Sequence, residues 1–190
     1  MIIGLKNLTW FPITEDKSTG TTYGAAVTLA GAIDAKINPE NVDPEIVHAD
    51  DVEWDSVTPD APYNIEVETV GFTLANLAAL QGHSLSTKGG VVVKEGDEPP
   101  YGAIAFQAAK SAKAGGGYRY VVLYKVKPAF AGAEYHTKEG STITRQRGKM
   151  TLRGISRISD GLKQYITEDS TEATNFFTAP ITPTMPSGGT

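Results

Sequence analysis

Apolar and polar residues alternate most clearly over residues 64–71 of this chain. A period of two places successive side chains on opposite faces of a strand, and it is typical of a strand with one buried face. One predicted face consists of Ile65, Val67 and Thr69, and the other of Glu66, Glu68 and Val70. The pattern therefore predicts a half-buried strand whose polar face carries two glutamates.

Runs rich in β-branched, aromatic and small residues predict further strands. They cover residues 22–29, 90–94, 101–110 and 118–127. Residues 14–20 are predicted to be a turn-rich stretch before the first strand. The two faces of the last strand are Tyr118, Tyr120, Val122, Tyr124 and Val126 against Arg119, Val121, Leu123 and Lys125. Because both faces are partly apolar, we expect this strand to be covered on both sides, as in a β-sandwich or at a subunit contact.

A short helix is predicted over about residues 73–81. Thr73 can cap its N-terminus, and Gly82 can close it in the left-handed conformation. A helix of about two turns is marginal alone, so we expect it to pack on a sheet. Its apolar face should consist of Leu74, Leu77 and Ala78.

A basic stripe is predicted over residues 143–153 if that stretch is extended. One face would carry Ile143, Arg145, Arg147, Lys149 and Arg153, and the other Thr144, Gln146, Met150 and Leu152. Such a stripe could follow a phosphate backbone, but it is more often solvated or paired with acidic residues. A strand pair is also expected around residues 138–140.

An acidic, proline-containing connection around residues 36–63 interrupts these elements. Its four prolines exclude a long helix, and residues 45–49 and 52–57 could form short strands within it. Such a long excursion from a compact domain is usually functional or disordered. A chain of 190 residues fits a single domain, expected over residues 1–177, with a flexible tail rich in Pro and Gly over 178–190.

Charge is segregated along the chain. Ten acidic residues and no Lys or Arg lie between residues 37 and 87, whereas residues 88–190 carry 14 basic and 9 acidic residues. Blocks of opposite sign could form complementary surfaces that favour head-to-tail association of identical copies. They could also be a solvated acidic loop and a solvated basic face. The net charge of −5 argues against a dedicated nucleic-acid binder.

Candidate chemistry is sparse. Without cysteine the chain has no disulfide, zinc-thiolate site or cysteine nucleophile. His48, His83 and His136 lie far apart, and neither a phosphate-binding loop nor a nucleophile elbow is present. Paired carboxylates such as Asp50 and Asp51 are too common here to indicate an active site. We therefore expect no enzymatic activity, metal or cofactor.

The sequence contains no apolar run long enough to cross a bilayer, and its start lacks the features of a secretory signal. A cytoplasmic protein is expected, unless a larger assembly carries it out. Trp10 and Trp54 could form a sugar-stacking platform, although a tryptophan near a strand more often fills a core or an interface.

Several segments, in their order, resemble the major tail protein family of siphophages, the long-tailed bacteriophages. These segments are residues 4–8, 48–51, 101–106, 118–127 and 134–143, followed by Gln146. The resemblance covers about residues 1–155, and the block at 134–143 is the most similar to the family. Order and spacing carry it, because no single segment is diagnostic.

This resemblance implies a mainly β subunit, an antiparallel β-sandwich or half-barrel of the tail-tube fold with one short flanking helix and long loops. Such subunits close into hexameric rings, which stack into a tube around the tape-measure protein and end at a tail terminator. DNA later passes through the bore without specific binding. The resemblance places the protein in the virion, after synthesis in the cytoplasm of a host bacterium, with no membrane partner.

Two sets of residues are candidates for these contacts. Subunit stacking is assigned to Asp50, Asp51, Glu53, Asp55, Arg145, Arg147, Lys149 and Arg153, and the lumen to Glu66 and Glu68. A conduit for a polyanion should not grip it, which favours neutral or acidic residues along the bore. The alternatives are a carbohydrate-binding or adhesion β-sandwich, and a tail terminator or head–tail connector that forms single rings.

Overall fold

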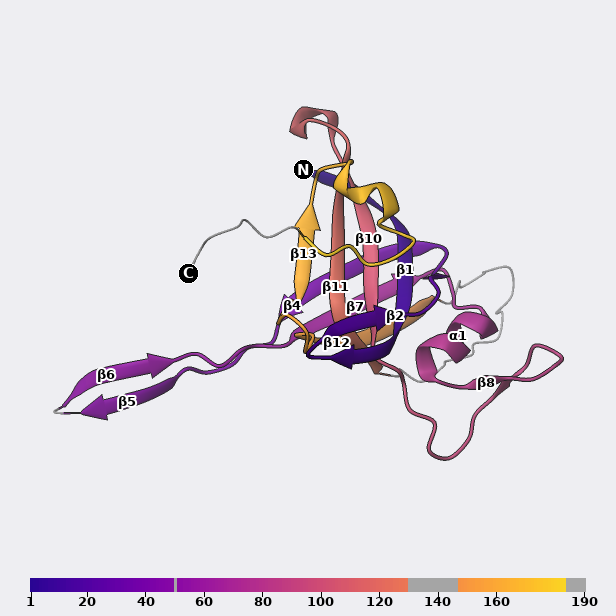
Figure 1. The fold of residues 1–190 in the computed structure, drawn as a ribbon. Helices are drawn as coiled ribbons and strands as arrows, with labels where there is room; N and C mark the ends of the chain where they lie inside the picture. The colour runs from indigo at the N-terminus through magenta and orange to yellow at the C-terminus, as the bar shows by residue number, and fades with distance from the viewer. Residues whose placement is uncertain (50, 130–146, 184–190) are drawn as a thin grey trace, which may run out of the picture.

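The computed structural model describes residues 1–49, 51–129 and 147–183 (Figure 1). Strands make up 51% and helices 9% of it, and the strand pairings are antiparallel. These values confirm the predicted mainly β fold with one α-helix, α1 (Leu74–Gln81). The sheet curls, but it does not close into a barrel.

One nine-stranded sheet forms the body of the molecule, in the order β2-β1-β10-β11-β12-β7-β4, with β13 added to β11 and β3 added to β1. Its strands are β1 (Ile2–Lys17), β2 (Gly20–Tyr23), β3 (Val27–Thr28), β4 (Ala32–Pro39), β7 (Tyr63–Thr69), β10 (Gly102–Lys110), β11 (Tyr118–Ala129), β12 (Gly148–Ile155) and β13 (Gln164–Thr167). Two hairpins lie outside it, β5 (Glu45–Ala49) with β6 (Val52–Val57), and β8 (Ser84–Leu85) with β9 (Val91–Val92). The short helices η1 (Ala112–Ala114) and η2 (Glu172–Asn175) complete the described elements.

The sheet curls along its longest central strand, β11. The first half of β11 pairs with β13, whereas the second half pairs with β12, so β12, β7 and β4 cross beneath β1 and β10 (Figure 1). The main core fills the curl. It includes Leu8, Trp10, Ile65, Val67, Ile104, Phe106, Val121, Leu123, Met150 and Leu152.

A second core covers the opposite face of β10 and β11. Ala173 of η2 and Phe176, which follows it, belong to this cluster together with Val122 and Tyr124. Tyr124 also donates a hydrogen bond from its hydroxyl to the carbonyl of Ile181 at 2.6 Å. The prediction that β11 is covered on both faces is therefore confirmed, and the described start of the expected C-terminal tail contacts the body.

A β-bulge corrects the predicted faces of β11. Gly102 pairs with Val126, but Ile104 pairs with Leu123, so β11 has one extra residue across this interval. An extra residue inverts the alternation beyond it. Val126 consequently joins the main core with Leu123, and not the outer core with Tyr124 as the alternation predicted.

The N-terminal strands were predicted incorrectly. β1 has 16 residues and runs into the stretch expected to be a turn, because Glu15 and Asp16 pair with Thr22 and Thr21 of β2. The expected strand at 22–29 is divided between the short strands β2 and β3. β4 lies partly within the expected connection, where its pairing with β7 outweighs its polar composition.

The helix begins and ends as predicted. The amide of Asn76 donates to the Thr73 hydroxyl at 3.2 Å, and Gly82 has a φ of 70°. Its buried side chains are Ala78, Leu80 and Gln81, whereas Leu74 is 52% exposed. The predicted apolar face was thus wrong at Leu74, because the C-terminal half of the helix is the part that is buried.

Candidate assembly surface

The hairpin of β5 and β6 projects from one side of the body, away from α1 and β8 (Figure 1). Its two strands coincide with the two short strands predicted in the acidic connection. The register runs from Glu45 opposite Val57 to Ala49 opposite Val52. We call residues 40–62, which include this hairpin and both of its connections to the body, the arm.

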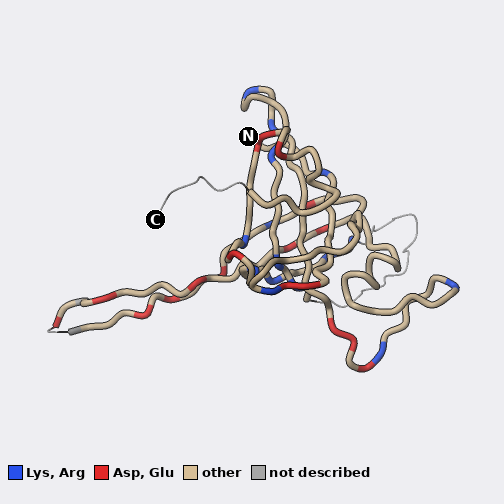
Figure 2. Tube along the Cα trace, viewed as in Figure 1, with Lys and Arg blue, Asp and Glu red and all other residues tan. Residues whose placement is uncertain are grey.

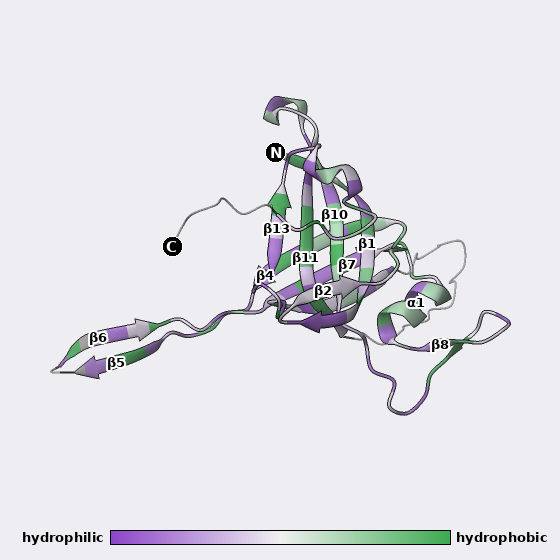
Figure 3. Cartoon of the chain, in the orientation of Figure 1, coloured by the Kyte–Doolittle hydropathy of each residue, from purple (hydrophilic) through white to green (hydrophobic). Residues whose placement is uncertain are grey.

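The arm exposes apolar side chains together with acidic ones. Figure 3 shows apolar positions along both of its strands, and Figure 2 shows acidic positions without basic ones. Its large apolar side chains are between 43% and 71% exposed, and they are Ile46, Val47, Val52, Trp54 and Val57. An isolated two-stranded hairpin is marginally stable in water, so this composition suits an element that is covered in an assembly.

The predicted stacking carboxylates lie in this arm. Asp51 and Asp55 are exposed, and Asp51 occupies the turn with a φ of 61°. Glu53 lies in β6, opposite His48. Asp50 is outside the described residues.

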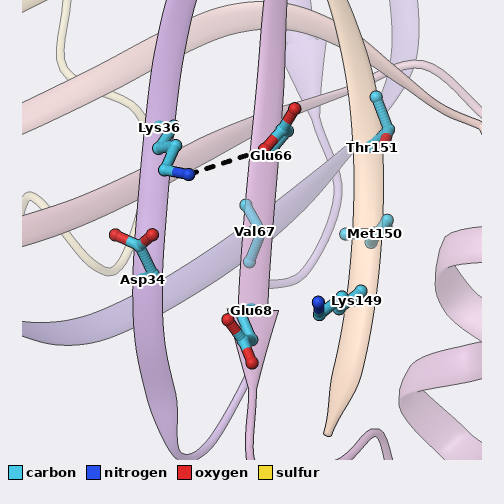
Figure 4. A pocket seen from close by; sticks show the side chains of 8 residues that line it. All are labelled: Asp34, Lys36, Glu66, Val67, Glu68, Lys149, Met150 and Thr151. Carbon is cyan, nitrogen blue, oxygen red and sulfur yellow. Dashed lines mark ion pairs between the residues drawn. The ribbon is translucent and has the colours of Figure 1, made fainter.

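A regular polar surface covers the outward face of β4, β7 and β12. Three side chains from each strand align in three rows, which we call the polar grid. The rows are Asp34, Glu68 and Lys149; Lys36, Glu66 and Thr151; and Asn38, Asn64 and Arg153. Residues between them, such as Ile65 and Leu152, point into the main core. A pocket on this face is lined by members of the first two rows (Figure 4).

Charges of opposite sign are adjacent on the polar grid. Lys36 Nζ lies 4.0 Å from Glu66 Oε2 (Figure 4). Arg147, which precedes β12 and lies outside the grid, places Nη1 3.0 Å from Glu68 Oε1. The grid contains three acidic and three basic side chains, so its formal charge is zero. A neutralised face of this kind offers a polyanion little net attraction.

The structure brings together two sets of residues that the sequence had separated. Glu66 and Glu68, expected in the lumen, share one face with Lys149 and Arg153, expected at a subunit contact. Arg147 also pairs with Glu68 of the same chain. Arg145 and the strand pair expected around residues 138–140 lie outside the described residues.

One largely buried ion pair lies away from the polar grid. Lys125 Nζ of β11 lies 2.6 Å from Asp16 Oδ2 of β1, and the Thr21 hydroxyl also donates to Asp16. Burial alone would raise the pKa of Asp16, but hydrogen bonds from Lys125 and Thr21 hold that pKa below its ordinary value. Sequence reasoning missed the pair because its members are 109 residues apart and no local pattern connects them.

A second buried charge secures the loop after β12. The guanidinium of Arg157 donates to both carboxylate oxygens of Asp160, at 2.6 and 2.5 Å, and lies over the ring of Tyr124. Burial opposes the charge of Arg157, but hydrogen bonds to Asp160 and Tyr23 raise its pKa. Burial raises the pKa of Tyr124. Both ion pairs therefore fix the packing of strands and loops.

Metal-binding geometry is absent from the part of the chain that the structure describes, which has no suitable group of three His, Asp or Glu side chains. His83 Nδ1 lies 2.8 Å from Asp97 Oδ2, and His48 lies on the arm. Trp10 is fully buried whereas Trp54 is exposed, so the two tryptophans do not form a shared platform. Among the described helices, none is long and apolar enough to span a membrane.

Comparisons with known proteins gave no match, either among protein-family models or among curated proteins. The function is therefore inferred from the chain itself. Two features stand out in its geometry, the acidic and apolar arm and the neutralised polar grid.

Proposed function

We propose that this chain is a structural subunit of a bacteriophage tail, the major tail protein, which self-assembles into stacked rings that form a tube. The resemblance of the sequence to siphophage major tail proteins supplies the family, and with it the expected hexameric ring. The observation that carries the proposal is the arm, whose exposed Trp54 and valines need a partner surface.

A second copy of the chain is the partner of the arm. Residues 40–62 contain eight acidic residues and no Lys or Arg, while residues 88–190 are net basic. A contact between different surfaces of identical subunits is heterologous, and it either closes a ring or extends a filament. An arm that projects from one side of the body can make this contact without moving the core.

The polar grid suits the wall of a bore. Each glutamate on it is aligned with a basic side chain or lies within a few ångströms of one. Affinity for DNA grows with every phosphate that an unpaired cation neutralises, so paired cations leave DNA free to pass. In the assembled tail, the same wall would first enclose the tape-measure protein.

Negative-stain electron microscopy of the concentrated full-length protein tests the proposal. Long tubes of constant diameter are expected. Single rings that do not extend would favour a tail terminator or connector. Dispersed particles that bind an array of glycans would replace the proposal with a carbohydrate-binding module that uses Trp54.

A further inference from the structure

The arm meets the body at a narrow base. There the amide of Glu40 donates to the carbonyl of Pro62 at 2.8 Å. This hydrogen bond joins the two connections between the arm and the body, which we call the first and second crossings. Beyond this bond, residues 41–44 and 58–62 belong to no strand. The direction of the hairpin is therefore not set by the ladder of the main sheet.

Prolines restrict both crossings. Pro39 and Pro44 precede β5, and Pro59 and Pro62 follow β6. Proline fixes its own φ and restricts the residue before it, so segments of this kind are stiff compared with Gly/Ser linkers. Stiff crossings transmit the orientation of the base to the hairpin.

Two basic side chains of the body contact this base, one from β12 and one from the residue before β13. Arg153 Nη2 of β12 lies 3.3 Å from Glu40 Oε2 on the first crossing. Lys163, just before β13, contacts the carboxylate of Asp60 and donates to the carbonyl of Ala61 at 2.7 Å on the second crossing. One contact thus holds each crossing, at Glu40 on the first and at residues 60 and 61 on the second.

We infer that Arg153 and Lys163 are positioning residues, which hold the arm at one angle to the polar grid by a two-point clamp on its base. The contacts of the clamp lie within a single chain and do not depend on the proposed function. Only the reason for orienting the arm, which is tube assembly, rests on that function. Arg153 also closes one row of the grid, so the wall and the arm share a residue.

Small changes at the base produce large changes at the tip. About ten residues separate the base from the turn, or about 33 Å at the usual rise of a strand. A rotation of about 10° at the base would then displace the tip by about 6 Å, more than the distance between neighbouring strands. Regular stacking of rings needs a smaller scatter than this.

Pulsed electron paramagnetic resonance can measure the scatter directly. The chain has no cysteine, so labels attach only at introduced sites, such as Ser56→Cys on the arm and Thr22→Cys on β2. Labelled full-length chain diluted into excess unlabelled chain reports distances within one molecule, whether or not it assembles. R153A/K163A is the test variant, and K149A is the matched control, because Lys149 lies on β12 opposite Glu68, in the row of the grid farthest from Arg153.

A narrow distance distribution is expected for the unmodified chain and for K149A. In R153A/K163A the population of displaced arms should rise by a factor of about 2 to 25, since each exposed ion pair is worth a factor of about 1.4 to 5. E40Q/D60N should broaden the distribution in the same way, because it removes the same ion pairs from the arm side. The exchange E40R/R153E restores one ion pair with the charges swapped, and its distribution should be narrower than that of R153A/K163A. An unchanged distribution in both the body-side and arm-side variants would overturn the clamp.

Assembly provides a separate readout. If the clamp serves the tube, R153A/K163A should form short or irregular tubes while keeping the thermal transition of the unmodified chain. A narrow distribution in an unmodified chain that never forms tubes would retain the clamp and overturn the tube assignment. Regular tubes from a variant with a broadened distance distribution would show that assembly does not need the clamp.

Discussion

Single residues where β1 pairs with β10 show how tightly the main core is filled. A Cβ added to Gly102 would lie 2.3 Å from the ring of Trp10 and 2.6 Å from the carbonyl oxygen of Phe11. Both neighbours are fully buried and cannot move into solvent. Only a glycine fits at this position, because the indole occupies the space of a side chain.

Gly102→Ala should lower the free energy of unfolding by about 1–3 kcal/mol, the usual cost of overpacking a core. Urea denaturation monitored by tryptophan fluorescence measures it. Gly4→Ala is the matched control on β1, where the nearest atom to an added Cβ is 3.9 Å away. Equal stability of the two variants would contradict the described packing of Trp10.

The Asp16–Lys125 ion pair should make the free energy of unfolding depend on pH in the acid range. The pKa of Asp16 is lowered in the folded state, so its contribution is present above the ordinary value of 3.8 and is lost as the pH falls through the folded value. Asp16→Ala should cost about 2–3 kcal/mol at pH 7, because it leaves Lys125 largely buried without its partner. The difference from the unmodified chain in urea titrations should shrink below about pH 4, whereas a constant difference would indicate lost packing alone.

At the scale of elements, the sequence predicted features that depend on neighbouring residues but not those that depend on strand pairing. The alternation of β7, the caps of α1 and the two short strands of the arm were all predicted, because neighbouring residues determine them. The length of β1, the existence of β4 and the bulge in β11 were not, because each depends on pairing with another strand, whose register no local pattern in the sequence shows. The polar grid depends on the register of β4, β7 and β12, so only four of its members were named beforehand, Glu66, Glu68, Lys149 and Arg153.

Charge balance on the polar grid should control its affinity for DNA. E66Q/E68Q removes the acidic partners of Lys36 and Arg147, with a net gain of two positive charges on this face. We expect it to bind duplex DNA measurably, with affinity falling about tenfold between 50 and 200 mM salt, as two phosphate contacts require. Fluorescence anisotropy measures this binding. D51N/D55N changes the net charge equally on the arm and should not bind, and binding by both variants would refute a role for the grid.

For the whole molecule, the arm should be separable from the body. Its ends are hydrogen-bonded to each other at Glu40 and Pro62, so replacing residues 42–60 with a short glycine linker should leave the main sheet intact. We expect this variant to unfold at nearly the same urea concentration but to remain monomeric by light scattering. Tubes formed without the arm would show that other surfaces drive stacking.

The order of strands in the main sheet also determines when strand pairing can be completed during synthesis of the chain. β1 pairs with β10, so Ile2 has no partner until Lys110 has been synthesised, and non-local pairing of this kind folds slowly. The arm leaves the ribosome early, but Arg153 and Lys163, which contact its base, are among the last residues of the folded body. Translation therefore completes the arm's anchorage only after Lys163 has emerged, when most of the chain has been made.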